Sequence, residues 1–211
     1  MIDLAPIASI GSGLGDALAE ITTALRVPVL LAAVFVLLLC AFELGRYGAE
    51  LYRRRWRTRH DDLAATVAAA IADPANVAAY AYRAPSAFAE RATYAIVEAA
   101  LSGRHASIEH ALADYELAVQ RRLDRTRILV RAGPAIGLMG TLIPLAPGLA
   151  ALGDGDVAQL ADDLRDAFAA TVIGLLVGTV AFALTLSRTR MYSEDLAALE
   201  RATNAYNKVP A

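Results

Sequence analysis

Two threonines, Thr141 and Thr171, are the polar residues whose placement suggests chemistry, because each lies in a long stretch without a charged residue. These stretches are residues 132–153 and 167–187. A hydroxyl can donate a hydrogen bond to a carboxylate or pass an ion to it, but it does not itself titrate. A buried threonine also commonly bonds the carbonyl one turn earlier, and that structural role is the alternative interpretation for both residues.

Enzyme, metal and cofactor chemistry is not indicated by the remaining residues. The three histidines are His60, His105 and His110, and a spacing of five places the last two on different helix faces, which does not suit a metal site. The chain has no P-loop lysine motif, no G-x-S-x-G motif and no Cys–His pair that its spacing would bring together. We therefore expect a protein that is not an enzyme and has no cofactor. Cys40, the only cysteine, is expected to be a small buried residue.

The composition favours a membrane protein. Of the 211 residues, 57% are hydrophobic and 20% are charged, with a mean hydropathy of +0.44, which excludes a disordered chain and disfavours a soluble enzyme. A third uncharged stretch covers residues 27–42, and Arg26 and Glu43 at its ends can reach toward the lipid headgroups. Because a bilayer core of about 30 Å needs about 20 apolar helical residues, we predict three transmembrane helices. A cleaved signal is the alternative for the first stretch, but its leader is acidic rather than basic.

The distribution of charge predicts the orientation. The segment 1–26 and the loop 154–166 together hold two basic and eight acidic residues, whereas the rest of the chain holds 18 basic and 14 acidic residues. The positive-inside rule therefore places the N-terminus outside and the C-terminus inside. The predicted organisation is an outer amphipathic segment (1–26), TM1 (27–45), a cytoplasmic helical segment (46–131), TM2 (132–153), an outer acidic loop (154–166), TM3 (167–187) and a cytoplasmic tail (188–211).

The predicted fold is an all-α membrane protein whose three spans are extended by long cytoplasmic helices. The inner segment is rich in alanine and is interrupted at Pro74, Pro85 and Gly103. We expect residues 44–71 to prolong the first span, a helix from Ser107 to run into the second, and residues 187–206 to prolong the third. Apolar residues at steps of three and four predict an amphipathic helix in residues 1–25, broken at its glycines.

Small residues four apart in the second and third spans predict close helix packing. The pairs are Gly133/Gly137 and Gly174/Gly178, and spacings of this kind let helix backbones approach within lipid. The prolines of the second span are interpreted as kinks or as hinges that free carbonyl groups; they are Pro134, Pro144 and Pro147. Glu43 is expected to pair with an arginine of a neighbouring helix, with a role at the ion exit as the alternative.

Two motifs carry a resemblance to a known family. Gly137-Leu-Met-Gly140-Thr141-Leu resembles the GLxGTV motif in the penultimate span of the MotA/TolQ/ExbB proton-channel family, and Ala169-Ala-Thr171-Val-Ile-Gly174-Leu resembles the ATAxGL motif in its last span. The similarity covers about residues 134–183, and the three-span topology is most similar to TolQ and ExbB. The chain departs from these two proteins after Thr141, where Ile-Pro-Leu-Ala-Pro-Gly replaces a tryptophan-glycine stretch.

The resemblance implies a function. Members of this family form pentamers whose last two spans surround the single span of a partner such as ExbD, TolR or MotB, which carries an essential aspartate. It also implies that Thr141 and Thr171 line the ion pathway and that Pro134 lies near its inner end. No span core of this chain contains an ionisable residue, and a proton relay needs one, so a partner that supplies the acid would complete the pathway.

We therefore predict a pore-forming subunit of an ion-driven motor or stator in the cytoplasmic membrane, a homo-oligomer that couples proton or sodium flow to mechanical work. The alternative is a non-conducting oligomeric scaffold that recruits a partner through its cytoplasmic helices. A small-solute transporter would show two related halves, and the sequence contains no internal repeat. The basic cluster at 53–59 is interpreted as an orientation signal that contacts lipid rather than nucleic acid.

Overall fold

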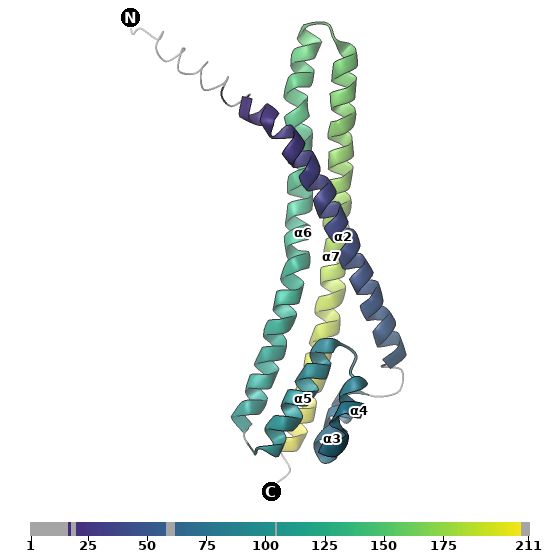
Figure 1. Ribbon diagram of the computed structural model, residues 1–211, viewed down its shortest axis with the longest axis vertical. Helices are drawn as coiled ribbons and strands as arrows, with labels where there is room; N and C mark the ends of the chain where they lie inside the picture. Colours follow the sequence, from purple (N-terminus) through teal and green to yellow (C-terminus); the bar gives the residue numbers. More distant parts are fainter. Residues whose placement is uncertain (1–16, 18–19, 58–61, 104, 208–211) are drawn as a thin grey trace, which may run out of the picture. The chain divides into compact units, whose positions relative to one another are not determined.

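The computed structural model describes residues 17, 20–57, 62–103 and 105–207, and all regular structure in them is helical (Figure 1). The elements are α2 (Arg26–Arg57), α3 (Leu63–Ala72), the short 3-10 helix η1 (Pro74–Asn76), α4 (Val77–Tyr82), α5 (Ala87–Leu101), α6 (His105–Gly153) and α7 (Val157–Asn207). The predicted all-α fold is confirmed. The helix expected in residues 1–25 lies almost entirely outside the described residues.

Three of the described helices are long and apolar enough to cross a membrane, and they contain α2, α6 and α7. A fourth candidate arises only if α3 is joined to the η1–α4 segment across a bend of 119°. Leu63 and Val67 of α3 are buried in a core that also contains residues of α5, α6 and α7, which explains the apolar character of α3 without a membrane. This chain thus has the three apolar helices of a multi-pass membrane protein.

The chain divides into two compact units, each of which contains part of every long helix. The first unit comprises Met1–Ala41 and Ile128–Ala181, and the second comprises Phe42–Arg127 and Phe182–Ala211. Two of the predicted spans end close to these divisions, because α2 passes from one unit to the other next to Glu43 and α7 does so shortly before Arg188.

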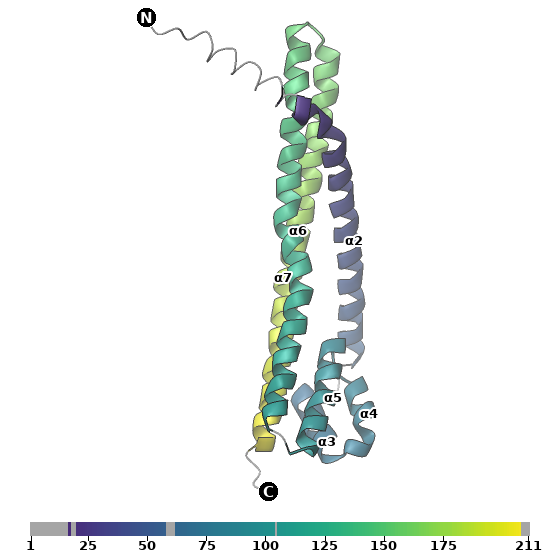
Figure 2. The same ribbon diagram turned by 60° about the vertical axis from the view of Figure 1, so that its left-hand side comes forward.

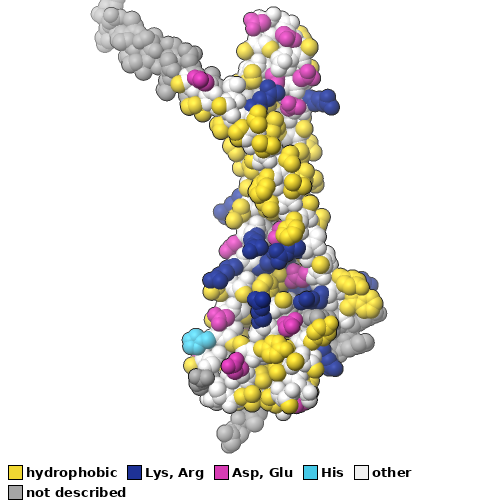
Figure 3. All heavy atoms as spheres, viewed as in Figure 1, with side chains coloured by type: hydrophobic (Ala, Val, Ile, Leu, Met, Phe, Trp, Pro, Cys, Tyr) yellow, Lys and Arg dark blue, Asp and Glu magenta, His cyan; other side chains and the backbone are white. Residues whose placement is uncertain are grey.

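The first unit packs segments of α2, α6 and α7 around a small apolar core. Its buried residues are Val36, Cys40, Leu129, Val177 and Ala181. Cys40 is 5% exposed, with its sulfur 3.9 Å from Val177 O, so the prediction of a small buried residue is confirmed. Its outer surface is also apolar: Leu31, Phe35 and Leu38 of α2 are each at least 60% exposed, and apolar side chains cover much of this unit in Figure 3. Such a surface suits contact with lipid rather than water.

The second unit packs α3, α4 and α5 with the first half of α6 and the last part of α7 (Figures 1 and 2). Side-chain caps begin two of its helices, because Asp62 accepts a hydrogen bond from Ala64 N and Ser86 accepts one from Ala89 N. The three predicted interruptions are confirmed. Pro74 starts η1, Pro85 lies between α4 and α5, and Gly103 has φ +64° between α5 and α6.

Two expected elements differ from the structure. The segment 154–166, predicted as a loop, is a turn of three residues followed by the first ten residues of α7, because the Asp156 carboxylate caps the helix at Gln159 N. Residues 44–71 do not form one helix: α2 ends at Arg57, and a new helix begins at Leu63 behind its Asp62 cap. The other two continuations are confirmed, since α6 and α7 each run without a break.

Candidate functional site

The two threonine hydroxyls lie half-buried on α6 and α7, each bonded to its own helix. Thr141 Oγ1 donates to Leu138 O at 2.7 Å, and Thr171 Oγ1 donates to Ala167 O at 3.4 Å. These bonds occupy the hydroxyl protons but leave oxygen lone pairs available. In this conformation each hydroxyl can accept a hydrogen bond from a protonated group or coordinate a cation.

Glycines bring the backbones of α6 and α7 together beside these threonines. A Cβ atom on Gly174 would lie 2.5 Å from Gly133 O and 2.7 Å from the Cα of Gly137, a separation that no real side chain allows. A Cβ on Gly178 would meet the Pro134 ring at 2.8 Å, so the ring of this helix-interior proline fits only because Gly178 has no side chain. The two predicted glycine pairs thus pack against each other within one chain.

The same contacts fix the positions of the two threonines along the helix axes. Gly137 faces the Cα of Thr171, and Gly140 faces Ala170, so in these antiparallel helices Thr141 lies at about the level of residues 168–170. Thr141 and Thr171 are therefore within about one helical turn of each other, roughly 5 Å along the axes. Counting from Arg131 places Thr141 near mid-membrane, about 15 Å deep, whereas the pairing with α7 places it only a few residues from Asp166.

Both threonines lie on the side of the α6–α7 pair that faces away from α2. Ile143 and Gly140 of α6 line a shallow groove with Val29 of α2, and Ile173 of α7 packs against the core around Val36 and Cys40. Each threonine is two positions before one of these isoleucines, which places it about 200° round its helix and thus on the opposite face. The α6–α7 pair therefore presents both hydroxyls on a face that α2 leaves open.

Charged side chains border the acidic end of the first unit. Asp163, only 1% exposed, accepts from Arg26 at 2.7 Å and from Gln159 at 3.1 Å, and Asp166 accepts from the same arginine at 3.3 Å. Gly148 of α6 packs against Asp163, so the uncharged stretch 132–153 lies partly beside the acidic start of α7. The uncharged stretches of α6 and α7 consequently overlap over only part of their length.

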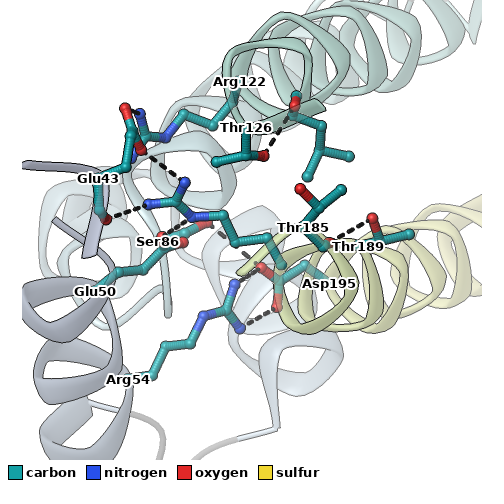
Figure 4. Close-up of polar contacts among 11 residues, drawn as sticks. Glu43, Glu50, Arg54, Ser86, Arg122, Thr126, Thr185, Thr189 and Asp195 are labelled. Carbon is teal, nitrogen blue, oxygen red and sulfur yellow. Dashed lines mark hydrogen bonds and ion pairs between the residues drawn. The ribbon is translucent and has the colours of Figure 1, made fainter. Parts of the chain in front are cut away.

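A second charged group, in the other unit, is built around Glu43. Its carboxylate accepts from Arg122 at 3.0 Å and from Arg188 at 2.8 Å, and its backbone carbonyl also accepts from Arg188 at 3.3 Å (Figure 4). Arg188 is fully buried, lies 5.8 Å from the Tyr47 ring and is 3.7 Å from Glu50. Because removing a buried charge from its partner is costly, these contacts tie α2, α6 and α7 together at Glu43.

A third polar group, in the same unit, surrounds Asp195. Arg54 binds its carboxylate through two nitrogens at 3.0 and 2.6 Å, and Ser86 donates to it at 3.4 Å (Figure 4). The Tyr115 hydroxyl also donates to it at 3.5 Å. Burial raises the pKa of Asp195, although the Arg54 guanidinium opposes the shift. Burial and the charge of Asp195 raise the pKa of Tyr115, so this hydroxyl keeps its proton. This network joins α2, α5, α6 and α7.

The predicted site residues fall into two groups. Thr141, Thr171, Pro134, Gly137, Gly140, Gly174 and Gly178 meet at the α6–α7 contact, whereas Pro144 lines the groove beside α2. Glu43 belongs to the separate group in the second unit. Sequence reasoning expected an arginine of a neighbouring helix as the partner of Glu43 but did not identify Arg122 and Arg188. The described residues contain no cluster of three or more His, Cys, Asp or Glu side chains suited to a metal ion.

Comparison with models of protein families identifies the family of this chain. The family model of the MotA/TolQ/ExbB proton channel family matches residues 85–200, which is more than half of the chain. The chain belongs to this family. Neither the comparison with curated proteins nor the comparison with solved structures gives a match.

Membership places this chain among proton-channel proteins rather than in an enzyme class. Members work as oligomeric channels with membrane partner subunits in energy-coupling complexes. The matched region contains both threonines and both buried arginines, Arg122 and Arg188, but not α2 and Glu43. The family match thus covers the α6–α7 pair on which the candidate ion pathway lies.

Proposed function

We propose that this chain is the pore-forming subunit of an ion-driven motor or stator that couples proton or sodium flow to mechanical work. In this proposal the open α6–α7 face with Thr141 and Thr171 lines the pathway. The observation that carries it is the placement of both hydroxyls within one turn of each other, on a face that is free of charge and not covered by α2.

A partner helix completes the pathway in this proposal. The described spans offer hydroxyl groups but no acid between residues 167 and 187 or between 132 and 153. A relay across the membrane needs an ionisable group there, and a single-span subunit resembling ExbD, TolR or MotB would supply it as an aspartate. Several copies of the chain, five in the form typical of the family, would place their open faces around this partner.

The proposed setting is the cytoplasmic membrane, with the N-terminus and the α6–α7 turn outside and the C-terminus inside. Arg26, Asp163 and Asp166 would mark the outer limit of the membrane, and Glu43 and Arg188 the inner limit. The span limits 27–45 and 167–187 agree with this placement. The contact between Gly148 and Asp163 supports a shorter membrane segment in α6 than the predicted 132–153.

Ion flux through the purified complex in liposomes tests the proposal. Replacing Thr171 with valine keeps the shape of the side chain and removes the hydroxyl, and we expect proton or sodium flux to fall about tenfold or more, the effect of losing roughly one hydrogen bond in the rate-limiting step. Thr189→Val is the matched control, because Thr189 is an exposed threonine of the same helix that also bonds a carbonyl one turn earlier but lies beyond Arg188, outside the uncharged stretch 167–187. Flux through Thr171→Val equal to that of the unaltered complex contradicts the proposed pathway.

The alternative, a non-conducting scaffold, makes a different prediction about composition. A scaffold needs no small single-span partner with a membrane aspartate. Mass spectrometry of the gently extracted complex would show several copies of this chain around one or two small companions if the motor proposal is right. An isolated chain that is monomeric and retains no companion contradicts it.

A further inference from the structure

A cavity of about 320 Å³ opens in the second unit beside the charged group around Glu43. It is bordered by α2, α5, α6 and α7, and its lining residues are Arg46, Ala49, Glu50, Arg53, Ser86, Ala87, Phe88, Arg122 and Tyr192. The ion pathway proposed above does not use this cavity. Its volume is within the range of small-ligand pockets.

The lining of the cavity carries an excess of positive charge. Arg122 is neutralised by Glu43 at 3.0 Å, and Glu50 faces Arg188 at 3.7 Å. Arg46 and Arg53, by contrast, form no ion pair within the described part of the chain, and Arg46 only stacks on the Phe42 ring at 5.6 Å. Two guanidinium groups therefore remain available to an anion at the cavity wall.

An aromatic side chain forms another part of the cavity wall. Tyr192 lines the cavity and is 2% exposed. Its hydroxyl is buried from the open space of the cavity. Burial and the charge of Glu50 raise the pKa of Tyr192, so the hydroxyl keeps its proton and adds no negative charge beside the two arginines.

The position of the cavity along α2 favours a lipid. Arg46 and Arg53 lie three and ten residues beyond Glu43, the first charged residue after the uncharged stretch, which corresponds to roughly 4 and 15 Å along the helix. The headgroup layer begins where the apolar core ends and is about 5–8 Å thick on each side. Arg46 therefore lies within this layer, whereas Arg53 lies beyond it and reaches it only through its long side chain. The apolar wall formed by Ala49, Ala87 and Phe88 suits the glycerol and first acyl carbons of a lipid.

We propose that this cavity binds the phosphodiester headgroup of an anionic phospholipid, held by Arg46 and Arg53. A bound lipid would fill the space between α2 and the α5–α7 helices of the second unit and would neutralise its unpaired arginines. The proposal depends on the chain spanning a membrane but not on ion conduction.

Native mass spectrometry of the detergent-purified complex tests this proposal. The probes are phosphatidylglycerol, phosphatidylcholine with the same acyl chains, and glycerol 3-phosphate as a soluble anion. We expect phosphatidylglycerol to bind with preference over phosphatidylcholine and not to be displaced by millimolar glycerol 3-phosphate. Equal binding of both lipids, or full displacement by the soluble anion, overturns the proposal.

Four variants and a control locate the binding. Arg46→Gln and Arg53→Gln should each weaken phosphatidylglycerol binding about fivefold, and the double variant about thirtyfold, from the usual contribution of an arginine near a charged membrane surface. Ala49→Trp changes no charge but fills the cavity, and it should reduce binding as strongly. Arg190→Gln, at an 84% exposed side chain away from the cavity, should leave it unchanged. Unchanged binding in all four cavity variants overturns the proposal in favour of nonspecific binding. A changed number of subunits in the arginine variants overturns it in favour of a neighbouring copy.

Discussion

At the residue scale, the Glu43 carboxylate joins three helices, because it accepts hydrogen bonds from two buried arginines of two other helices. Arg188 has no exposed surface and Arg122 is 8% exposed, so neither guanidinium can turn to water if the carboxylate is lost. Breaking a buried ion pair from one side leaves an uncompensated charge, whereas an exposed pair contributes little.

The first prediction compares two glutamates with opposite exposure. Glu43→Gln leaves Arg122 without an anion and leaves Arg188 only the Glu50 carboxylate at 3.7 Å, so it should cost about 3–5 kcal/mol of unfolding free energy, which corresponds to a fall of roughly 6–20 °C in Tm. Glu194→Gln removes a 65% exposed partner of Arg190 and should change the free energy by less than about 0.5 kcal/mol. Thermal unfolding of both variants in the same detergent measures the difference. Equal melting temperatures would show that the Glu43 contacts do not stabilise the fold.

Residue types revealed the hydroxyls and the glycines but not the buried charges. Thr141 and Thr171 are noticeable because their surroundings contain no charge, whereas Arg122 lies within a run of arginines that predicts a solvated face. One signal was available: Arg122 is seven residues after Tyr115 and three after Val119, on the apolar stripe of its helix. Its partner Glu43 is 79 positions away, and no local spacing rule joins residues so distant.

At the element scale, the contact between α6 and α7 depends on the absence of side chains. Gly133, Gly137, Gly174 and Gly178 bring two backbones into direct contact, and Gly140 meets the Cβ of Ala170. Within lipid, helix association gains little free energy from the hydrophobic effect. Close packing of this kind is therefore a main source of the free energy that holds the helices together. The same contact sets the levels of Thr141 and Thr171.

The second prediction tests this contact with a single methyl group. Gly174→Ala would place a Cβ within 2.5 Å of Gly133 O, so one helix must move, and we expect destabilisation by roughly 1–3 kcal/mol together with reduced ion flux. Gly48→Ala is the matched control, since no atom lies within 4 Å of its added Cβ and alanine favours the helix by about 0.5–1 kcal/mol. Thermal unfolding and liposome flux of both variants measure the effect. A Gly174→Ala variant as stable as Gly48→Ala would contradict the need for close approach.

Element ends were predicted well where proline or glycine marks them and poorly where an aspartate cap does. Pro74, Pro85 and Gly103 each coincide with a break. Asp62 and Asp156, however, read as ordinary acidic residues in the sequence although both begin a helix through their side chains. An aspartate is common in loops and at helix starts alike, so its type alone does not distinguish the two.

At the scale of the whole molecule, the predicted orientation in the membrane rests on charge alone. The acidic residues near the α6–α7 turn and the arginines of the second unit are far apart in the sequence, and the positive-inside rule assigns them to opposite sides. Helix positions within one chain do not reveal which side is which, so orientation requires a labelling experiment.

The third prediction tests the orientation by labelling introduced cysteines after the single native cysteine has been removed. In a Cys40→Ala background, a cysteine at Asp154, in the turn between α6 and α7, should react with a membrane-impermeant maleimide in intact spheroplasts, because this turn is expected outside. A cysteine at Ser102, between α5 and α6, should react only after lysis, since the second unit is expected inside. Both positions are at helix ends rather than in a packed core, so a difference in labelling of at least tenfold before lysis reflects sidedness rather than burial. The opposite pattern would invert the topology and place the arginine-rich cavity at the outer leaflet, whereas equal labelling of both positions would contradict a fixed orientation.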